Sequence, residues 1–254
     1  MPRDSMTSLI EKIARKASVT FKNCGSSANG ENNVFLENQG ELSNLLNEIR
    51  AADLKITPRK IKSSSKSQSH SPPVTYMHIC ETKAFSLGVF LLKTGASIPL
   101  HDHPGMNGML KVLYGKVSIR CFDKLDNPPD AESEIQFNPP LIPDEKEALR
   151  RSILSSIGEY TEESGPCILT PLKDNLHQID AVDGPAAFLD ILAPPYDPDD
   201  GRDCHYYKVL QTVSENADKK SGQQEQEEIW LLKISQPDDF WCGGEPYPGP
   251  EVSV

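Results

Sequence analysis

Two histidines that stand one residue apart form the pattern in this sequence most able to do chemistry. His101 and His103 flank Asp102, and the segments around them alternate apolar and polar residues as β-strands do. Residues i and i+2 of a strand point to the same face, so both imidazoles can reach one point. Because imidazole is a common metal ligand, this spacing predicts a metal site.

The glycines around this histidine pair resemble the first motif of the cupins, a family of small β-barrels that hold a metal inside. Gly95 and Gly115 stand at the motif's distances from the pair, but Asn107 or Gly108 occupies the place of its glutamate. The resemblance implies a mainly β fold, a cupin barrel of the double-stranded β-helix, jelly-roll-like type. We expect N-terminal helices and a C-terminal extension around this barrel.

A metal site of this kind needs a third ligand, and His177 is the candidate. Gly165 and Pro171 match the first half of the second cupin motif, whereas His177 comes one position late. Two alternatives remain open. His177 could be an ordinary hydrogen-bonded histidine, and His205 is a weaker competitor for the ligand role.

The absent glutamate shapes the expected chemistry. Ordinary cupins and the 2-His-1-carboxylate oxygenases bring an anionic ligand to the metal, whereas three neutral imidazoles leave a divalent ion with its full charge. Such a site suits an anionic substrate, and a thiolate is the obvious soft one because a metal deprotonates a bound thiol. Three histidines suit zinc hydrolysis equally well, so the ligand type does not select the metal.

A turn signal adds an acidic residue to the predicted site. Asp183-Gly184 is typical of a hairpin turn, and a two- or four-residue loop there places His177 opposite Asp190. Asp190 would then face the barrel interior within an apolar run, where a carboxylate needs a partner. It could hold a ligand imidazole or receive a substrate ammonium. The alternative is an aspartate that faces outward.

The chain divides into four expected parts. They are a helical segment at 1–61 that packs on the barrel, a linker at 62–73, the cupin barrel at 74–212 with an insertion at 124–163, and a loop, last strand and C-terminal tail at 213–254. Composition and turn signals set these boundaries, since the linker is rich in Ser and Lys and the insertion in Pro and acidic residues.

Hydrophobic periodicity predicts the individual elements. Helices are expected at 4–20, capped by Asp4 or Ser5, and at 41–54, with a loop at 23–40 between them. A short helix is expected near 145–153, and the proline-rich tail is not expected to form a strand. The expected strands are 85–92, 110–121 with a turn at Tyr114–Lys116, 167–170, 176–182, 186–193, 205–210 and 229–234.

Composition limits the class of partner. The formal charge of −11 argues against a nucleic-acid backbone as ligand. No apolar run approaches the ~20 residues of a membrane span, so no membrane is expected. The N-terminus carries no recognisable secretory leader, so we expect a cytoplasmic location and free thiols at the six cysteines. A monomer is the expected oligomeric state.

Three blocks of sequence resemble the thiol dioxygenases, the group of cupins that includes the cysteamine dioxygenases and the plant cysteine oxidases. The blocks lie at 73–79, 101–106 and 191–207, and the resemblance covers most of the chain. It implies Fe(II) held by His101, His103 and His177, and the addition of both atoms of O2 to a thiol to give a sulfinic acid. The implied substrates are cysteamine, which gives hypotaurine, and proteins or peptides with an N-terminal cysteine, which links the group to oxygen sensing through the N-degron route.

The same resemblance assigns further site residues. It matches Asp190 and Tyr196 to an aspartate and a tyrosine near the iron. Cys204 and Tyr206 stand two residues apart, so on a strand they share a face and could form a thioether cross-link. Independent packing of these two side chains is the alternative.

No arginine is well placed to clamp a substrate carboxylate. Arg120 alternates with apolar residues that face the other way, and Arg202 lies in an Asp-rich loop. Cysteamine and Cys-initiated peptides are therefore the expected substrates, with free L-cysteine a poor one. Two other functions remain: a metal cupin of another reaction, such as an isomerase or a dioxygenase acting on carbon, and a non-catalytic metal-binding cupin that serves as a regulatory module.

Overall fold

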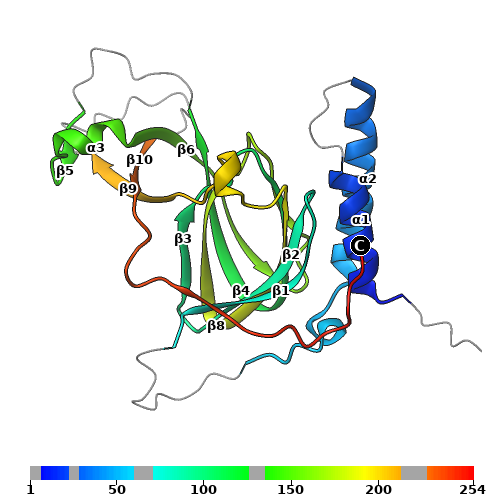
Figure 1. Cartoon of the computed structure of the whole chain (residues 1–254). Coiled ribbons are helices and arrows are strands. Elements are labelled where there is room, and N and C mark those ends of the chain that lie inside the picture. The colour runs from blue at the N-terminus through cyan, green and yellow to red at the C-terminus, as the bar shows by residue number, and fades with distance from the viewer. Residues whose placement is uncertain (1–6, 23–28, 60–70, 126–134, 213–227) are drawn as a thin grey trace, which may run out of the picture.

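The computed structural model describes residues 7–22, 29–59, 71–125, 135–212 and 228–254. Two helices lie beside a β-barrel, and the C-terminal segment runs past the barrel to end beside them (Figure 1). The helical elements are α1 (Leu9–Phe21), α2 (Asn29–Glu48), η1 (Ala51–Leu54), α3 (Pro143–Glu147) and η2 (Pro198–Asp200). The strands are β1 (Val74–Glu81), β2 (Ser86–Leu92), β3 (Ser97–His101), β4 (Asn107–Lys124), β5 (Phe137–Asn138), β6 (Leu149–Thr161), β7 (Cys167–Leu169), β8 (Leu176–Ala193), β9 (Tyr206–Thr212), β10 (Glu228–Ile234) and β11 (Cys242–Gly244).

Helix α1 begins later than its sequence pattern predicted. Ser8 is its N-cap, and the Ser8 hydroxyl accepts a hydrogen bond from the backbone N–H of Glu11 at 3.3 Å. The predicted caps Asp4 and Ser5 lie outside the described residues. The cap therefore defines a helix start that the apolar stripe alone did not.

Helix α2 begins at Asn29, so the prediction of a loop over 23–40 is wrong from that residue on. Contacts with α1 hold this part of α2. The rings of Phe21 and Phe35 lie 6.1 Å apart, and the Lys16 ammonium donates to the Asn38 side chain at 3.0 Å. Tertiary packing of this kind overrides the weak helix propensity of Asn and Gly.

The apolar faces of the two helices pack against the outside of the barrel, as predicted. Burial of each large aliphatic side chain contributes about 1.5–3 kcal/mol, so this shared cluster is the main attachment of the helices. It joins residues of α1 and α2 to residues of β2 and β8: Ile10, Ile13, Leu42, Leu46, Leu87, Val89, Leu189 and Ile191.

A ring of six hydrogen-bonded strands closes the barrel. β8 pairs with β3, β3 with β9, β9 with β10, β10 with β6 and β6 with β4, and β4 returns to β8. The sheet continues from β8 through β2 and β1 to β11, and β7 pairs with β4. Apolar side chains of β4 and β8, among them Val112, Ile119, Ile179 and Phe188, form the interior core. The fold is the mainly β, jelly-roll-like cupin barrel that the sequence predicted.

The two longest strands bend at the places where turns were predicted. β8 continues through Asp183-Gly184 and β4 continues through Tyr114–Lys116, so both predictions of a chain reversal are wrong. Asp183 and Gly115 have positive φ angles of 58° and 74°, and the pairing register of β4 with β8 shifts there. Extra residues at such irregularities bend a strand and change the face of the side chains that follow.

Much of the segment 124–163 takes part in the sheet. β6 pairs with β4 along Lys116–Lys124, and β10 pairs with β6 on its other side. The helix predicted near 145–153 is wrong beyond Glu147, where α3 ends and β6 soon begins. Most side chains of β6 are partly or fully exposed, so the strand contributes pairing to the sheet more than it contributes side chains to the core.

The C-terminal tail contains a short strand, contrary to prediction. β11 pairs in parallel with β1, with Gly244 opposite Tyr76. The prolines of the tail follow this strand, so they remove no hydrogen bond from it. This pairing brings the tail to the edge of the sheet beside the barrel mouth.

All cysteines in the described parts of the chain are free thiols, as predicted; Cys24 lies outside those parts. Within the same residues, no helix is long and apolar enough to cross a membrane.

Candidate metal centre

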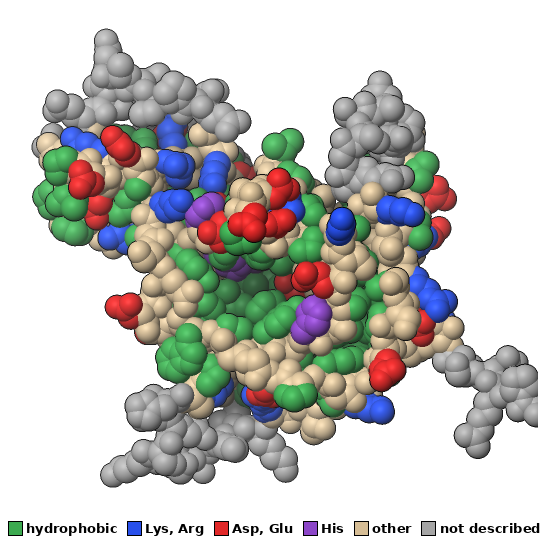
Figure 2. Space-filling view, in the orientation of Figure 1, with side chains coloured by type: hydrophobic (Ala, Val, Ile, Leu, Met, Phe, Trp, Pro, Cys, Tyr) green, Lys and Arg blue, Asp and Glu red, His purple; other side chains and the backbone are tan. Residues whose placement is uncertain are grey.

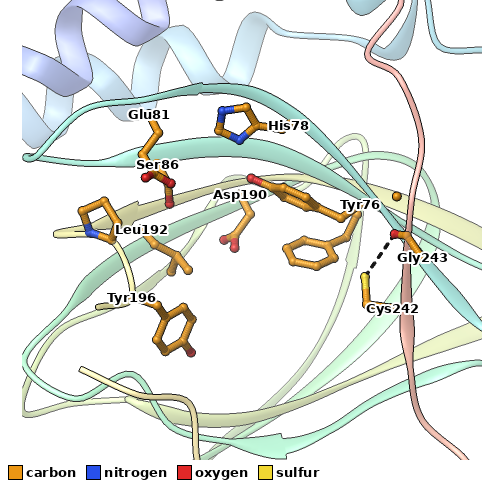
Figure 3. A pocket seen from close by; sticks show the side chains of 12 residues that line it. Tyr76, His78, Glu81, Ser86, Asp190, Leu192, Tyr196, Cys242 and Gly243 are labelled. Carbon is orange, nitrogen blue, oxygen red and sulfur yellow. Dashed lines mark hydrogen bonds between the residues drawn. The ribbon is translucent and has the colours of Figure 1, made fainter. Parts of the chain in front are cut away.

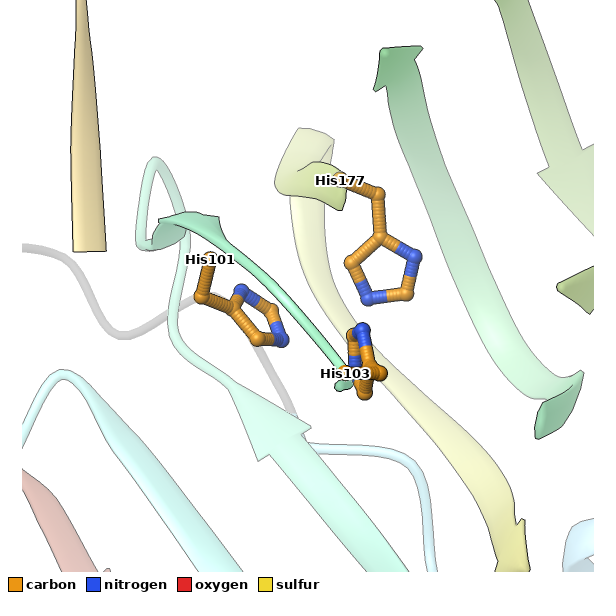
Figure 4. Close-up of side chains that lie close together, drawn as sticks. All are labelled: His101, His103 and His177. Atoms are coloured by element: carbon orange, nitrogen blue, oxygen red, sulfur yellow. The ribbon is translucent and has the colours of Figure 1, made fainter. Parts of the chain in front are cut away.

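Three histidines from different elements converge inside the barrel. His101 ends β3, His103 follows it, and His177 lies on β8 directly opposite His101 (Figure 4). One ring nitrogen from each lies within 4.8 Å of the others, and all three side chains are buried. Within the described residues, this group contains the three histidines and no carboxylate. The structure therefore brings together the three predicted ligands, with the neutral donor set that the absent glutamate implied.

Backbone carbonyls orient two of these imidazoles. The Nδ1 atom of His101 lies 2.8 Å from the carbonyl oxygen of Pro99, and Nδ1 of His103 lies 2.8 Å from that of Asn175. A carbonyl only accepts, so each Nδ1 carries the proton and each Nε2 keeps its lone pair. The Asn175 side chain also bonds the backbone of His103, which fixes the position of this ligand.

The electrostatics keep the three rings neutral. Burial lowers the pKa of all three, and burial together with the neighbouring His101 lowers the pKa of His103 to about 3. Neutral imidazoles have free lone pairs, so this centre is prepared for a cation and not for a proton. Figure 4 shows one ring nitrogen of His177 facing His103, while its Nδ1, which is buried without a hydrogen-bond partner, lies on the other side of the ring. The fit to a metal ion comes from the donor set itself, because three neutral nitrogen ligands lie within 4.8 Å of one another.

Asp102 stabilises the segment His101–His103 that carries two of the candidate ligands, a role that sequence reasoning missed. Its carboxylate accepts hydrogen bonds from the backbone N–H of His205 at 2.9 Å, the Tyr207 hydroxyl at 2.9 Å and the Lys124 ammonium at 3.1 Å. Burial alone would raise its pKa, but Lys124 and these bonds hold the pKa below its ordinary value. The available signal was the position of Asp102 between two predicted ligands. In an extended segment, the side chain between two residues that share a face points to the opposite face.

The same contacts remove His205 as a competing ligand. Its Nδ1 lies 3.1 Å from the Asp102 carboxylate, and His205 is not a member of the three-histidine group. His205 therefore contacts Asp102, which lies between two of the candidate ligands, and is not itself a ligand.

A pocket of about 500 Å³ opens at the barrel mouth beside this centre. Figure 2 shows the mouth as a hollow with mostly hydrophobic walls and acidic side chains at its edge. Asp190 and Tyr196 both line the pocket, and Figure 3 shows Asp190 pointing into it. Among the described residues, no lysine or arginine lines it; the residues that do are Tyr76, His78, Glu81, Ser86, Phe90, Asp190, Leu192, Pro195, Tyr196, Cys242, Gly243 and Gly244.

Asp190 reaches the pocket by a different register from the predicted one. It lies opposite Gly88 of β2 and Leu110 of β4, whereas His177 lies opposite His101 and Cys121. The hairpin argument is therefore wrong, although its conclusion about the face holds because β8 bends between the two residues. Burial raises the pKa of Asp190 to about 7.

Tyr196 connects the pocket to the metal centre. Its ring centroid lies 5.7 Å from that of His103, and its hydroxyl donates to the backbone carbonyl of Asp102 at 2.7 Å. Burial raises the pKa of Tyr196 well above its ordinary value, so the phenol keeps its proton. The structure therefore places Tyr196 between the pocket and a candidate metal ligand.

Cys204 lies between two tyrosines. Its thiol is hydrogen-bonded to the side chains of Tyr196 and Tyr206, and burial raises the pKa of the thiol to about 11. Tyr206 in turn has its ring 6.4 Å from that of His101. The structure therefore brings the predicted Cys204 and Tyr206 pair together, close to a metal ligand.

Comparison with known proteins agrees with this geometry. A family model described as PCO_ADO matches residues 45–252. The chain belongs to this family. It is 59% identical to the 2-aminoethanethiol dioxygenase of Mus musculus over 99% of both chains, and 58% identical to that of Homo sapiens, also over 99% of both. It is 30% identical to plant cysteine oxidase 1 of Arabidopsis thaliana, over 84% of this chain and 71% of that one.

Proposed function

We propose that this protein is an Fe(II)-dependent thiol dioxygenase that oxidises cysteamine to hypotaurine and N-terminal cysteine to its sulfinic acid. The observation that carries the proposal is the buried group of three neutral histidines without a carboxylate, in a chain of the PCO_ADO family. The balanced reaction is R–SH + O2 → R–SO2H, in which the thiol sulfur is oxidised and O2 is reduced. Iron would be held by His101, His103 and His177 and would supply the redox chemistry.

The residues around the centre would prepare the substrate. Asp190, when ionised, would accept hydrogen bonds from the substrate ammonium and so direct the thiol toward the histidines. Tyr196 would keep a neutral phenol beside His103, where its hydroxyl donates to the backbone carbonyl of Asp102 and holds the residues between the two ligands in place. The apolar side chains Phe90 and Leu192 would limit water around the reacting sulfur.

The charges of the pocket support an aminothiol over an amino acid. Both arginines considered from sequence are engaged elsewhere: Arg120 lies 3.9 Å from Asp180, and Arg202 is paired with Asp200. A free carboxylate would therefore meet Asp190 without a compensating cation. Cysteamine and a Cys-initiated peptide both lack that carboxylate, so one binding mode serves both.

Oxygen uptake tests the proposal directly. Anaerobically purified protein should contain iron, and with Fe(II) it should consume O2 with cysteamine and with a Cys-initiated peptide, but poorly with L-cysteine. Absence of uptake with every thiol would favour the non-catalytic regulatory module. Free cysteine as the best substrate would contradict the role given to Asp190 while leaving the metal centre intact.

The cellular setting is a further part of this proposal. An oxygen-dependent modification of N-terminal cysteine would make the protein an oxygen sensor of the N-degron route, acting as a monomer in the cytoplasm. The 30% identity to a plant cysteine oxidase supports the choice of substrate. Fractionation of cells and the half-life of a Cys-initiated reporter with and without oxygen would test it.

A further inference from the structure

The pocket contains one carboxylate more than a small aminothiol can use. Glu81 and Asp190 both line it, and neither has a hydrogen bond or an ion pair with any described residue. Cysteamine has a single ammonium, which the proposed function assigns to Asp190. Glu81 is then left for a second cationic group.

A strand irregularity aims Glu81 at the pocket. The pairing of β1 with β2 shifts register between His78 and Cys80, so Cys80 packs in the cluster below the helices while Glu81 lines the pocket with Tyr76. Bulges of this kind often redirect a side chain beside a functional site. Without the shift, strict alternation from Tyr76 would turn Glu81 away from the pocket.

Tyr76 also lines the pocket, beside Asp190 and Glu81. Gly88, opposite Asp190, leaves room for the ring, because a Cβ at that glycine would lie 2.2 Å from the Tyr76 side chain. Burial raises the pKa of Tyr76, and the negative charges of Asp190 and Glu81 raise it further, so the phenol lies near both. The pocket therefore has an inner carboxylate at Asp190 and an outer one at Glu81, which is exposed.

The size of the pocket agrees with a ligand longer than cysteamine. Four heavy atoms fill roughly 100 Å³ at about 30 Å³ per water-sized group, whereas the pocket holds about 500 Å³. We propose that its outer part, with Glu81 as the specificity-determining residue, binds a cationic side chain on the residue that follows an N-terminal cysteine. This inference rests on the proposed function, in which the cysteine amine occupies Asp190.

Peptides that differ only in their second residue test the proposal. The iron-loaded full chain should oxidise Cys-Lys, Cys-Gln and Cys-Glu peptides in that order of kcat/KM, with about two- to fivefold between Lys and Gln, as expected for one partly exposed ion pair. Glu81→Gln should remove this difference by raising KM for the Lys peptide. The kcat/KM for each peptide is divided by the kcat/KM for cysteamine of the same variant, so a general loss of activity cancels.

Glu48→Gln is the matched control, because Glu48 is exposed at the end of α2 and outside the pocket. It removes the same charge and should preserve the preference for Lys. An unchanged preference in Glu81→Gln, or an equal loss in both variants, would overturn the subsite. Equal oxidation of all three peptides would also overturn the subsite, while the proposed function would stand. Oxidation of cysteamine but of no peptide would instead refute the part of the proposed function that makes N-terminal cysteine a substrate.

Discussion

Replacement of Asp190 by asparagine should stabilise the fold at neutral pH while it weakens the use of amine substrates. The folded protein raises the pKa of this carboxyl from 3.8 to about 7 because burial disfavours its charge. Below pH 3.8 the carboxyl is protonated in both the folded and the unfolded chain. As the pH rises toward about 7, the unfolded chain releases the proton and the folded chain retains it, so stability falls over that window.

The size of this effect follows from the two pKa values. A difference of about three pKa units corresponds to about 4 kcal/mol at about 1.4 kcal/mol per unit. Asp190 keeps part of its surface open to the pocket, so water there reduces the penalty. We therefore expect Asp190→Asn to raise the free energy of unfolding by about 2 kcal/mol at about pH 8, with little change at about pH 4.

Urea unfolding of the metal-free protein across this pH range is the assay. The wild type should lose stability between about pH 4 and pH 7 relative to Asp190→Asn, and Asp199→Asn is the control because Asp199 is exposed on η2. The iron-loaded variant should show a much lower kcat/KM for cysteamine. If the free energy of unfolding varied with pH in the same way for the wild type and for Asp190→Asn, the raised pKa of the buried carboxyl would be refuted. If the variant were more stable but had wild-type turnover, the role of Asp190 toward the substrate amine would be refuted.

Three further predictions concern the metal centre and its supports. His177→Ala should lower iron content and oxygen uptake together, whereas His205→Ala should retain iron; metal analysis of both variants separates a ligand from a neighbour. Asp102→Asn should lower the free energy of unfolding by about 2–3 kcal/mol because buried donors lose a charged acceptor, a change that urea titration would detect and that a wild-type midpoint would contradict. After turnover with O2, a Cys204–Tyr206 thioether should reduce the mass of the chain by two hydrogen atoms, and Cys204→Ala should show no such loss by mass spectrometry.

Local sequence was sufficient where the geometry itself is local. The spacing of two predicted that His101 and His103 converge, and they do, although β3 ends at His101 and Asn175 fixes His103. Helical spacing likewise predicted that the N-terminal helices bury one face on the barrel. The third ligand, His177, followed from the resemblance to cupins more than from its own spacing, which departs from their motif by one position.

Tertiary structure decided what depends on pairing between distant strands. Asp183-Gly184 has the local signature of a hairpin, but β8 continues through it because β4 provides a partner on both sides of the bend. The network of Asp102 joins residues about a hundred positions apart, which no local pattern reveals. The residue types around His101 thus predicted a barrel with a metal site. The register shifts of β1, β4 and β8 determined that Asp190 and Glu81 share its pocket. A shift of one residue turns the side chains that follow it to the opposite face of the sheet.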